Sequence, residues 1–390
     1  MTTYHPAPSP AHTRGGARSW APIAALSFGI ATLVGSEFLP ASVLPAIAAD
    51  IGVREGVAGL AVAMTAVAGA VTAPTIAVVL PRADRRVVLL GLLALATLSN
   101  LAVAVTPNFA LLLIARLVLG VAIAGYWSFA FGAGVTARPG RDHVVSTALF
   151  VGVSVATIVV VPLSSLAGDA IGWRAVFLGA AGVSALSLAA VAATLPQVPA
   201  HPSAGLTMMR RAVANRLLMA GVGCIVLFVF GNFVAYPYIR LAIDDVAPDR
   251  AAWLLLAWGV GGLAGNLVAG ALSARLRLLA TVGPVLLGGG LALSAGTATV
   301  AVFAVAIVVW GIGFNLTTVV SQLWVTRVEP EHAESAMALQ VTAFQSAITL
   351  AAVVGGALVD AYDVQVALLV GAASAVASGI GFALLRVPRD

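Results

Sequence analysis

Long apolar segments run along almost the whole chain, and short groups of glycine, proline and arginine separate them. A segment of about 20 apolar residues is long enough to cross the hydrocarbon of a bilayer as a helix. Only a segment that satisfies its own backbone hydrogen bonds is stable there, so these segments predict helices. The pattern therefore predicts an all-α membrane protein. We expect twelve transmembrane helices, at residues 21–44, 56–80, 87–106, 109–135, 145–168, 174–194, 217–240, 252–273, 278–296, 300–325, 336–358 and 364–386.

A polar stretch in the middle of the chain divides the predicted helices into two halves of six. This stretch contains Pro196, Pro199 and Pro202 and reads as a cytoplasmic linker, whereas the proline-rich start of the chain reads as a disordered cytoplasmic tail. We expect a tail at 1–19, a first half at 20–194, a linker at 195–216 and a second half at 217–390.

A weak internal repeat supports this division. Ala148-Leu149 and the residues that follow can be laid over Ala338-Leu339 and its continuation. Each copy begins a predicted helix after a basic loop and ends near an acid, Asp169 or Asp360. A duplication of six helices places the copies in this way, so the two halves are predicted to be pseudo-symmetric.

Composition excludes a soluble protein and several kinds of enzyme. Hydrophobic residues make up 61% of the chain, charged residues only 9%, and the mean hydropathy is +1.06. A soluble domain has roughly a quarter of its residues charged. All 20 basic residues are arginine, so the chain has neither a phosphate-binding loop lysine nor a Schiff-base nucleophile. An ion gradient is therefore the expected energy source.

The arginines also predict the orientation in the membrane. With a cytoplasmic N-terminus, fifteen arginines fall in cytoplasmic segments and four in outer loops. Positively charged residues accumulate in cytoplasmic loops, so we expect a multi-pass protein of the inner or plasma membrane with both termini in the cytoplasm. The same distribution accounts for a sequence pI near 10.1 and gives no reason to expect a nucleic acid partner.

Five short motifs occur in the order found in one known family. They lie at residues 36–40 (SEFLP), 44–50 (LPAIAAD), 116–120 (RLVLG), 172–174 (GWR) and 231–233 (GNF). With these motifs the chain resembles the major facilitator superfamily, and within it the arabinose-efflux group of bacterial drug and metabolite proton antiporters. The resemblance implies two six-helix halves, alternating access and export of a small organic solute coupled to protons.

Two further segments, 125–127 (GYW) and 152–156 (GVSVA), are similar to those of purine ribonucleoside efflux proteins. Two others depart from the superfamily's motifs. The loop at 81–86 reads PRADRR in place of the fuller GxxxDRxGRR, and Val161-Pro162 stands where the antiporter motif has Gly-Pro. The first departure concerns a gating loop and the second concerns the antiport mechanism.

Glu37 is the only acidic residue well inside a predicted helix, and Arg116 is the only basic one. A charge at membrane depth is costly and is retained for a partner or a function. Burial favours a protonated carboxyl group and a nearby cation favours an ionised one, so such a group can switch during transport. Both residues lie roughly 10 Å below the outer surface, at about 1.5 Å per residue. We predict them as the proton-coupling residues; the alternatives are a structural ion pair and an arginine that only binds backbone carbonyls.

Aromatic and amide side chains recur on single faces of the predicted helices. Phe228, Asn232 and Tyr236 share a face of the seventh, and Trp310 and Phe314 share a face of the tenth. Aromatic walls with scattered amides suit a planar or amphipathic solute, although helix packing is the alternative for each residue. The predicted substrate-binding residues are Tyr126, Trp127, Asn232, Tyr236, Trp310, Phe314, Asn315 and Gln345.

No group of residues suggests an enzyme, a metal site or a cofactor. All five histidines fall in predicted cytoplasmic segments, and no nucleophilic triad can be assembled at one depth. We therefore predict a monomeric secondary transporter whose partners are protons, the bilayer and a small molecule. Its substrate would be a purine nucleoside-like metabolite or a drug, with a role in drug resistance. The alternatives are a uniporter or importer of a sugar or other metabolite, and a non-transporting membrane sensor.

Overall fold

The computed structural model describes residues 20–80, 82–199, 214–330 and 333–385. Twelve helical segments in these ranges are long and apolar enough to cross a membrane, and each bound lies within five residues of the predicted one. The predicted all-α membrane fold is therefore confirmed. The spans are Ala21–Ser42, Glu55–Ile76, Arg85–Ala104, Phe109–Ala137, Val144–Ile171, Trp173–Thr194, Arg216–Asp244, Pro248–Ala271, Ser273–Ala295, Val300–Val328, Leu339–Ala361 and Val364–Leu384.

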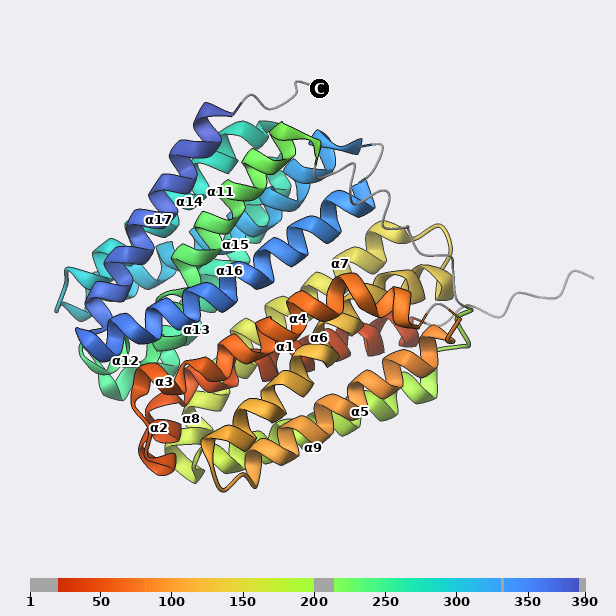
Figure 1. The fold of residues 1–390 in the computed structure, drawn as a ribbon, viewed down its shortest axis with the longest axis horizontal. Helices are drawn as coiled ribbons and strands as arrows, with labels where there is room; N and C mark the ends of the chain where they lie inside the picture. Colours follow the sequence, from red (N-terminus) through yellow and green to blue (C-terminus); the bar gives the residue numbers. More distant parts are fainter. Residues whose placement is uncertain (1–19, 81, 200–213, 331–332, 386–390) are drawn as a thin grey trace, which may run out of the picture.

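The first six spans pack as one bundle, in which α4 lies against α6, α5 against α6 and α9, and α1 against α7 and α9 (Figure 1). Its elements are α1 (Ala21–Ser42), α2 (Leu44–Ile51), α3 (Glu55–Ala58), α4 (Leu60–Val79), α5 (Arg85–Ala104), α6 (Phe109–Ala137), α7 (Asp142–Val155), the π-helical turn η1 (Ala156–Val160), α8 (Val161–Ile171) and α9 (Trp173–Thr194).

The last six spans form the second bundle, in which α15 lies against α13 and α14, and α17 against α11 and α14. Its elements are α11 (Arg216–Phe233), η2 (Tyr236–Tyr238), α12 (Ile239–Asp244), η3 (Pro248–Arg250), α13 (Ala251–Ala271), η4 (Ser273–Arg275), α14 (Leu276–Ala295), α15 (Val300–Val328), α16 (Ala333–Ala361) and α17 (Val364–Leu384).

Two spans are interrupted by prolines. Pro237 has no amide hydrogen to donate to the carbonyl of Phe233, and α11 ends at that residue. The short turn η2 follows and carries Tyr236 and Tyr238 away from the axis of α11. In the fifth span, the π-helical turn η1 ends two residues before Pro162, which likewise cannot donate to the residue four positions before it. Both interruptions lie where the two halves touch, since η2 contacts α1 and η1 contacts α13.

The start of the predicted linker is attached to the first half. The Asp84 carboxylate caps α5 by accepting from the amide of Arg86 at 2.8 Å, and it also accepts from the amide of Val198 at 3.1 Å. The guanidinium of Arg86 donates to the carbonyl of Ala192 at 2.6 Å. The loop that departs from the superfamily motif therefore holds residues 195–198 beside α5. Most of the predicted linker and all of the predicted N-terminal tail lie outside the described residues.

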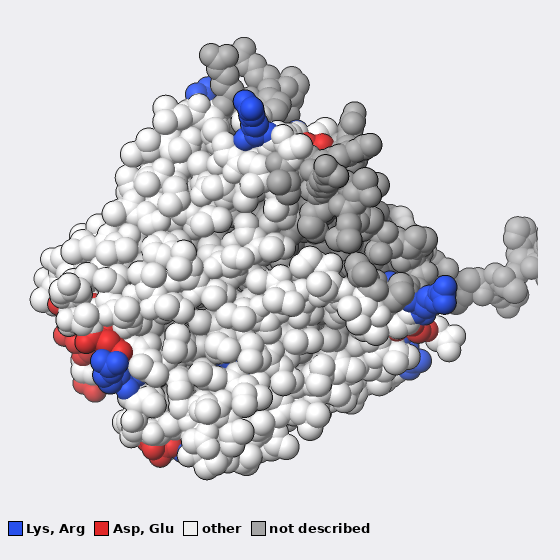
Figure 2. Space-filling view, viewed as in Figure 1, with Lys and Arg blue, Asp and Glu red and all other residues white. Residues whose placement is uncertain are grey.

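The halves meet at the end of the bundle where α2, α3 and α12 lie side by side, which we call the sealed end (Figure 1). There α16 of the second half packs on α3 and α4 of the first half, and α13 packs on α8. Figure 2 shows that charged side chains gather at the two ends of the helices, separated by a broad surface almost free of charge. An uncharged band between charged ends is what a bilayer requires of a protein that spans it.

Candidate functional site

Arg116 is completely buried in the first half, where it binds main-chain oxygens. Its Nε donates to the carbonyl of Ala61 at 3.0 Å, Nη1 to that of Ser36 at 2.9 Å, and Nη2 to that of Glu37 at 2.8 Å. These bonds join α6 to α1 and α4 and satisfy three of the five guanidinium N–H groups. Arg116 and Glu37 are thus neighbours, and the hydrogen bond between them runs to the main chain of Glu37.

Glu37 is half-buried in α1, five residues before the end of its span. In the described spans the other acidic residues lie within two residues of a span end. Glu37 is therefore the one acidic side chain in the interior of a described span, next to the guanidinium of Arg116. A carboxyl group at this depth that keeps some access to its surroundings can exchange a proton.

Asn100 also binds this part of α1. This buried side chain donates through Nδ2 to Oγ of Ser36 at 2.9 Å and to Oγ of Ser184 at 3.2 Å, which links α5 to α1 and α9. Together, Asn100 and Arg116 fix the backbone that carries Glu37. Asn100 was not among the predicted site residues, although an asparagine inside an apolar span was an available signal, since a buried amide needs partners.

An aromatic cluster fills the second half beside Glu37. Its members are Phe228, Phe233, Tyr236, Trp258, Trp310, Phe314 and Phe344. The Tyr236 and Trp258 ring centroids lie 4.7 Å apart, and Trp258 stacks on Phe314 at 6.3 Å. Phe38 of the first half, next to Glu37 in the chain, meets the Tyr236 ring edge-on at 5.2 Å. The cluster is therefore in direct contact with the segment that carries the acid.

The cluster contains buried polar atoms as well as rings. The indole Nε1 of Trp310 donates to Oδ1 of Asn232 at 2.7 Å. Three other buried atoms, Nδ2 of Asn232, Oη of Tyr236 and Nε1 of Trp258, have no hydrogen-bond partner among the described residues. Buried polar atoms usually have partners, so this group is unusual for a packed core.

Four of the predicted substrate-binding residues come together here: Asn232, Tyr236, Trp310 and Phe314. Of the cluster members that the sequence analysis missed, Trp258 is the most informative. A tryptophan in the interior of an apolar span brings an N–H group into a region that has few acceptors, and this was the signal available for Trp258.

The other four predicted binding residues lie elsewhere. Tyr126 of α6 is buried against α1, where its hydroxyl donates to the carbonyl of Leu26 at 3.4 Å. Trp127 packs against Phe150 with ring centroids 6.1 Å apart.

Asn315 donates to the carbonyl of Gly311 in its own helix, at 3.2 Å, and lies against Gly262 of α13. Gln345 of α16 reaches Gly69 of α4 in the opposite half, so close that a Cβ at Gly69 would lie 2.2 Å from its Nε2. Of these four residues, Gln345 is placed between the two halves, whereas Asn315 packs between two helices of the second half.

At the sealed end, an arginine of the second half reaches into the first. Arg240 in α12 is only 9% exposed. Its Nη1 donates to Oγ of Ser165 at 2.8 Å and to Oδ2 of Asp169 at 3.2 Å, and its Nη2 lies 3.2 Å from Oδ1 of Asp169. Its Nε donates to Asp244 of its own helix at 2.8 Å. One guanidinium therefore joins both halves.

In a second ion pair at this end, the arginine belongs to the first half and the acid to the second half. Arg54 of the first half lies with its Nε 3.4 Å from Oδ2 of Asp360 in the second half, and Oδ1 of Asp360 accepts from the amide of Gly56 at 2.9 Å. The hydroxyl of Tyr238 donates to the carbonyl of Gly56 at 3.1 Å. The backbones are so close that a Cβ at Gly56 would lie 2.2 Å from the carbonyl oxygen of Gly356.

The two ion pairs have a similar arrangement. Each joins an arginine of one half to an acid near the end of the fifth span of the other half; Arg54 lies just before the second span of its half, and Arg240 lies near the end of the first span of its half. The acids are Asp169 and Asp360, the two that end the copies of the sequence repeat. The hydrogen bonds and ion pairs that we find between halves among the described residues all lie at this end. We call Arg54, Gly56, Asp169, Tyr238, Arg240 and Asp360 the seal.

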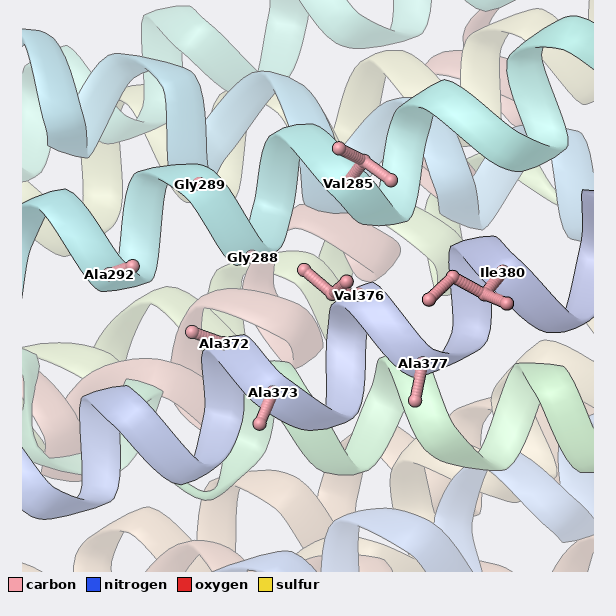
Figure 3. A pocket seen from close by; sticks show the side chains of 9 residues that line it. All are labelled: Val285, Gly288, Gly289, Ala292, Ala372, Ala373, Val376, Ala377 and Ile380. Atoms are coloured by element: carbon pink, nitrogen blue, oxygen red, sulfur yellow. The ribbon is translucent and has the colours of Figure 1, made fainter.

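A separate groove lies on the surface of the second half. Figure 3 shows that it runs between α14 and α17 and is lined by aliphatic side chains and glycines alone. It offers no polar group to orient a solute and lies within one half. A groove of this kind suits lipid chains or helix packing, and we do not consider it part of the candidate site.

Comparison with known proteins gives concordant matches. A family profile described as Major Facilitator Superfamily matches residues 26–215 and 218–390. The chain is 35% identical over 353 residues to the purine ribonucleoside efflux pumps NepI of Salmonella paratyphi B and Salmonella typhimurium, covering 88% of this chain and 88% of each relative. These matches confirm the resemblance predicted from the motifs.

A solved structure shares the fold. It is the crystal structure of a bacterial homolog to the human lysosomal transporter Spinster, in an inward-facing and unoccupied conformation. The TM-score is 0.74 at 14% sequence identity, over 94% of this chain and 95% of that one. This likeness supports the arrangement of the twelve spans.

Proposed function

The chain belongs to the major facilitator superfamily and is a membrane transporter rather than an enzyme; from this premise we propose that it exports a purine nucleoside-like solute in exchange for protons. The observation that carries the proposal is the position of Glu37. It is the acidic side chain in the interior of a described span, and it lies between a buried arginine and an aromatic cluster.

Glu37 would carry the proton. A carboxyl group at membrane depth is stable when neutral, or when a cation such as Arg116 faces its ionised form. Arg116 has three of its N–H groups on main-chain oxygens, so it does not form a closed ion pair that would hold Glu37 permanently ionised. Protonation and release can then alternate as the site faces one side of the membrane and then the other.

The aromatic cluster would hold the solute, and Phe38 would couple the two events. The Phe38 ring follows Glu37 in α1 and lies 5.2 Å from the Tyr236 ring. A solute that displaces Tyr236 or its neighbours must therefore change the packing beside the acid. Flat aromatic walls suit the flat base of a nucleoside, and the NepI pumps are named as exporters of purine ribonucleosides. Drugs of similar shape are the second candidate.

The distribution of arginines orients the protein. Arg54, Arg174, Arg240 and Arg250 lie at the sealed end, and the other described arginines outside α6 lie at the opposite end. The positive-inside rule makes the opposite end cytoplasmic. We therefore infer that the seal joins the halves on the outside, that the site faces the cytoplasm in this state, and that both termini are cytoplasmic.

Cysteine labelling tests this orientation. In a Cys224→Ala background, which removes the single cysteine, a cysteine in place of Asp249 should react with an impermeant maleimide added to intact cells. A cysteine in place of Arg141, at the other end of the bundle, should react only after the cells are permeabilised. Labelling of the Arg141 position in intact cells would reverse the orientation.

Transport into everted membrane vesicles tests the function. With the lumen made one pH unit more acidic than the medium, radiolabelled inosine should accumulate about tenfold, since one proton per neutral solute stores that ratio. A protonophore should reduce the ratio to one. A uniporter would reach only equal concentrations under both conditions, and an importer or a sensor would give no accumulation, so either result would contradict the proposal.

A further inference from the structure

The aromatic cluster contains three buried polar groups that have no hydrogen-bond partner in the described part of the chain, and all three are able to donate. They belong to Asn232, Tyr236 and Trp258, whose side chains are at most 1% exposed. The Tyr236 and Trp258 rings lie 4.7 Å apart at their centroids. Trp310 is hydrogen-bonded to Asn232, and its ring centroid lies 6.4 Å from that of Tyr236. The three residues thus belong to one cluster.

The chemistry of Trp310 determines which atom of Asn232 is free. An indole nitrogen is only a donor, so the atom of Asn232 that faces it must be the amide oxygen. Trp310 Nε1 lies 2.7 Å from that oxygen. The Nδ2 group, with two hydrogens, is therefore the end of Asn232 that has no partner among the described residues. The amide N–H₂, the indole N–H and the phenol O–H can all donate hydrogen bonds to acceptor atoms of a ligand.

We propose that Asn232, Tyr236 and Trp258 form a donor site for the acceptor-bearing edge of a planar heterocyclic base, an inference that rests on the proposed transport function. Ring nitrogens and a ring carbonyl supply acceptors in the plane of such a base, and its faces stack on aromatic rings. A saturated sugar has hydroxyl acceptors but no flat face, and a hydrocarbon-like drug has a flat face but few acceptors. The donor site therefore selects the base rather than the sugar of a nucleoside.

In the cytoplasm-facing state, aromatic side chains of the protein cover this donor site. Phe38 and Phe233 meet the Tyr236 ring at 5.2 and 6.0 Å, and Phe314 stacks on Trp258 at 6.3 Å with an angle of 25° between the planes. Phe314 is 7% exposed. A base can replace these ring contacts by stacking its own faces on the aromatic rings, while its acceptor atoms receive hydrogen bonds from the three donor groups. Binding would thereby move Phe38, next to Glu37.

Binding of inosine to the purified full-length protein tests the donor site. Trp258→Phe keeps an aromatic ring but removes the N–H group together with part of the indole, so the Kd for inosine should rise about tenfold, the typical effect of losing one hydrogen bond. Asn232→Asp keeps an oxygen for Trp310 and removes the N–H₂ donor, and it should weaken binding at least as much.

Trp324→Phe is the matched control. Nε1 of Trp324 is also buried without a partner among the described residues, but its ring packs against Phe382, outside the cluster. Its Kd for inosine should stay within about twofold of the parent. If Trp258→Phe binds inosine like the parent, or if Trp324→Phe weakens binding equally, the donor site is wrong.

Deaza analogues of inosine, each lacking one ring nitrogen, identify the acceptor. At least one of 3-deazainosine and 7-deazainosine should bind the parent more weakly than inosine, and that difference should vanish in one donor variant. A parent that transports and binds inosine but does not distinguish either analogue refutes the donor site alone. A parent that binds no purine nucleoside refutes the proposed substrate class and the donor site together.

Discussion

Glu37→Gln is expected to abolish proton-driven accumulation of inosine, reducing the ratio in everted vesicles from about tenfold per pH unit to one. Glutamine keeps the shape of the side chain and its capacity for hydrogen bonds, but it cannot take up or release a proton. Because the glutamine is neutral at every pH, the affinity of the variant for inosine should no longer vary with pH, whereas that of the parent should. Exchange of internal for external inosine should persist, because it needs no net movement of protons.

The matched control for Glu37→Gln is Glu55→Gln, the same chemical change at an exposed residue of the sealed end. That variant should accumulate inosine like the parent. Exchange must be measured in the same vesicles, since a variant that neither accumulates nor exchanges has lost folding or binding rather than coupling. Full accumulation by Glu37→Gln would mean that another group, or another ion, drives transport.

The sequence predicted the twelve spans well because of the physical demands of the bilayer. A segment such as Phe109–Ala137 must be apolar along its length and must satisfy its own backbone. The predicted spans differ from the observed ones only at their ends, where polar as well as apolar residues are tolerated. The interruptions were less visible. A proline such as Pro237 is a visible signal for a helix break, whereas the π-helical turn before Pro162 leaves no pattern in the spacing of apolar residues.

The depth of a residue in the membrane could be predicted by counting along its span. The direction in which its side chain points from the helix could not. Counting residues placed Glu37 and Arg116 at one level, yet it did not show that the guanidinium would bind carbonyls of Ser36, Glu37 and Ala61. In a soluble helix, a polar face reveals which side is buried. Here the lipid-facing side is apolar too, as the 65% exposed Val87 illustrates, so the sequence carries no such signal.

This missing signal explains the uneven prediction of the site. Asn232 and Tyr236 were named because they share a face with other aromatic residues, and they do lie in the cluster. Tyr126 was named for its place in a motif, and it lies between α1 and α6 instead. Trp258 was overlooked because its helix reads as glycine-rich packing. The partners of the repeat acids Asp169 and Asp360 were also unpredictable, since each lies in the opposite half.

Loss of Arg240 should open the seal. Arg240→Gln leaves Asp169 and Asp244 facing each other without the cation that now lies between them. Breaking a buried charge pair costs about 3–5 kcal/mol, but the Asp169 side chain is 57% exposed, which lowers the expected effect to about 1–2 kcal/mol. That is about a tenfold shift toward the state that is open to the outside.

A cysteine in place of Gln345 reports on this shift, because Gln345 lies against Gly69 between the halves. In a Cys224→Ala background, an impermeant maleimide added to intact cells should label it about tenfold faster in Arg240→Gln than in the parent. The other ion pair between the halves supplies the control. Arg54→Gln breaks the pair with Asp360, in which the Arg54 side chain is 74% exposed. Exposed pairs contribute about 1 kcal/mol at most, so labelling should change by about twofold or less.

Equal rates in Arg240→Gln and the parent would show that Arg240 does not hold the halves together. Equally fast labelling in both arginine variants would instead show that burial does not decide which ion pair keeps the seal closed.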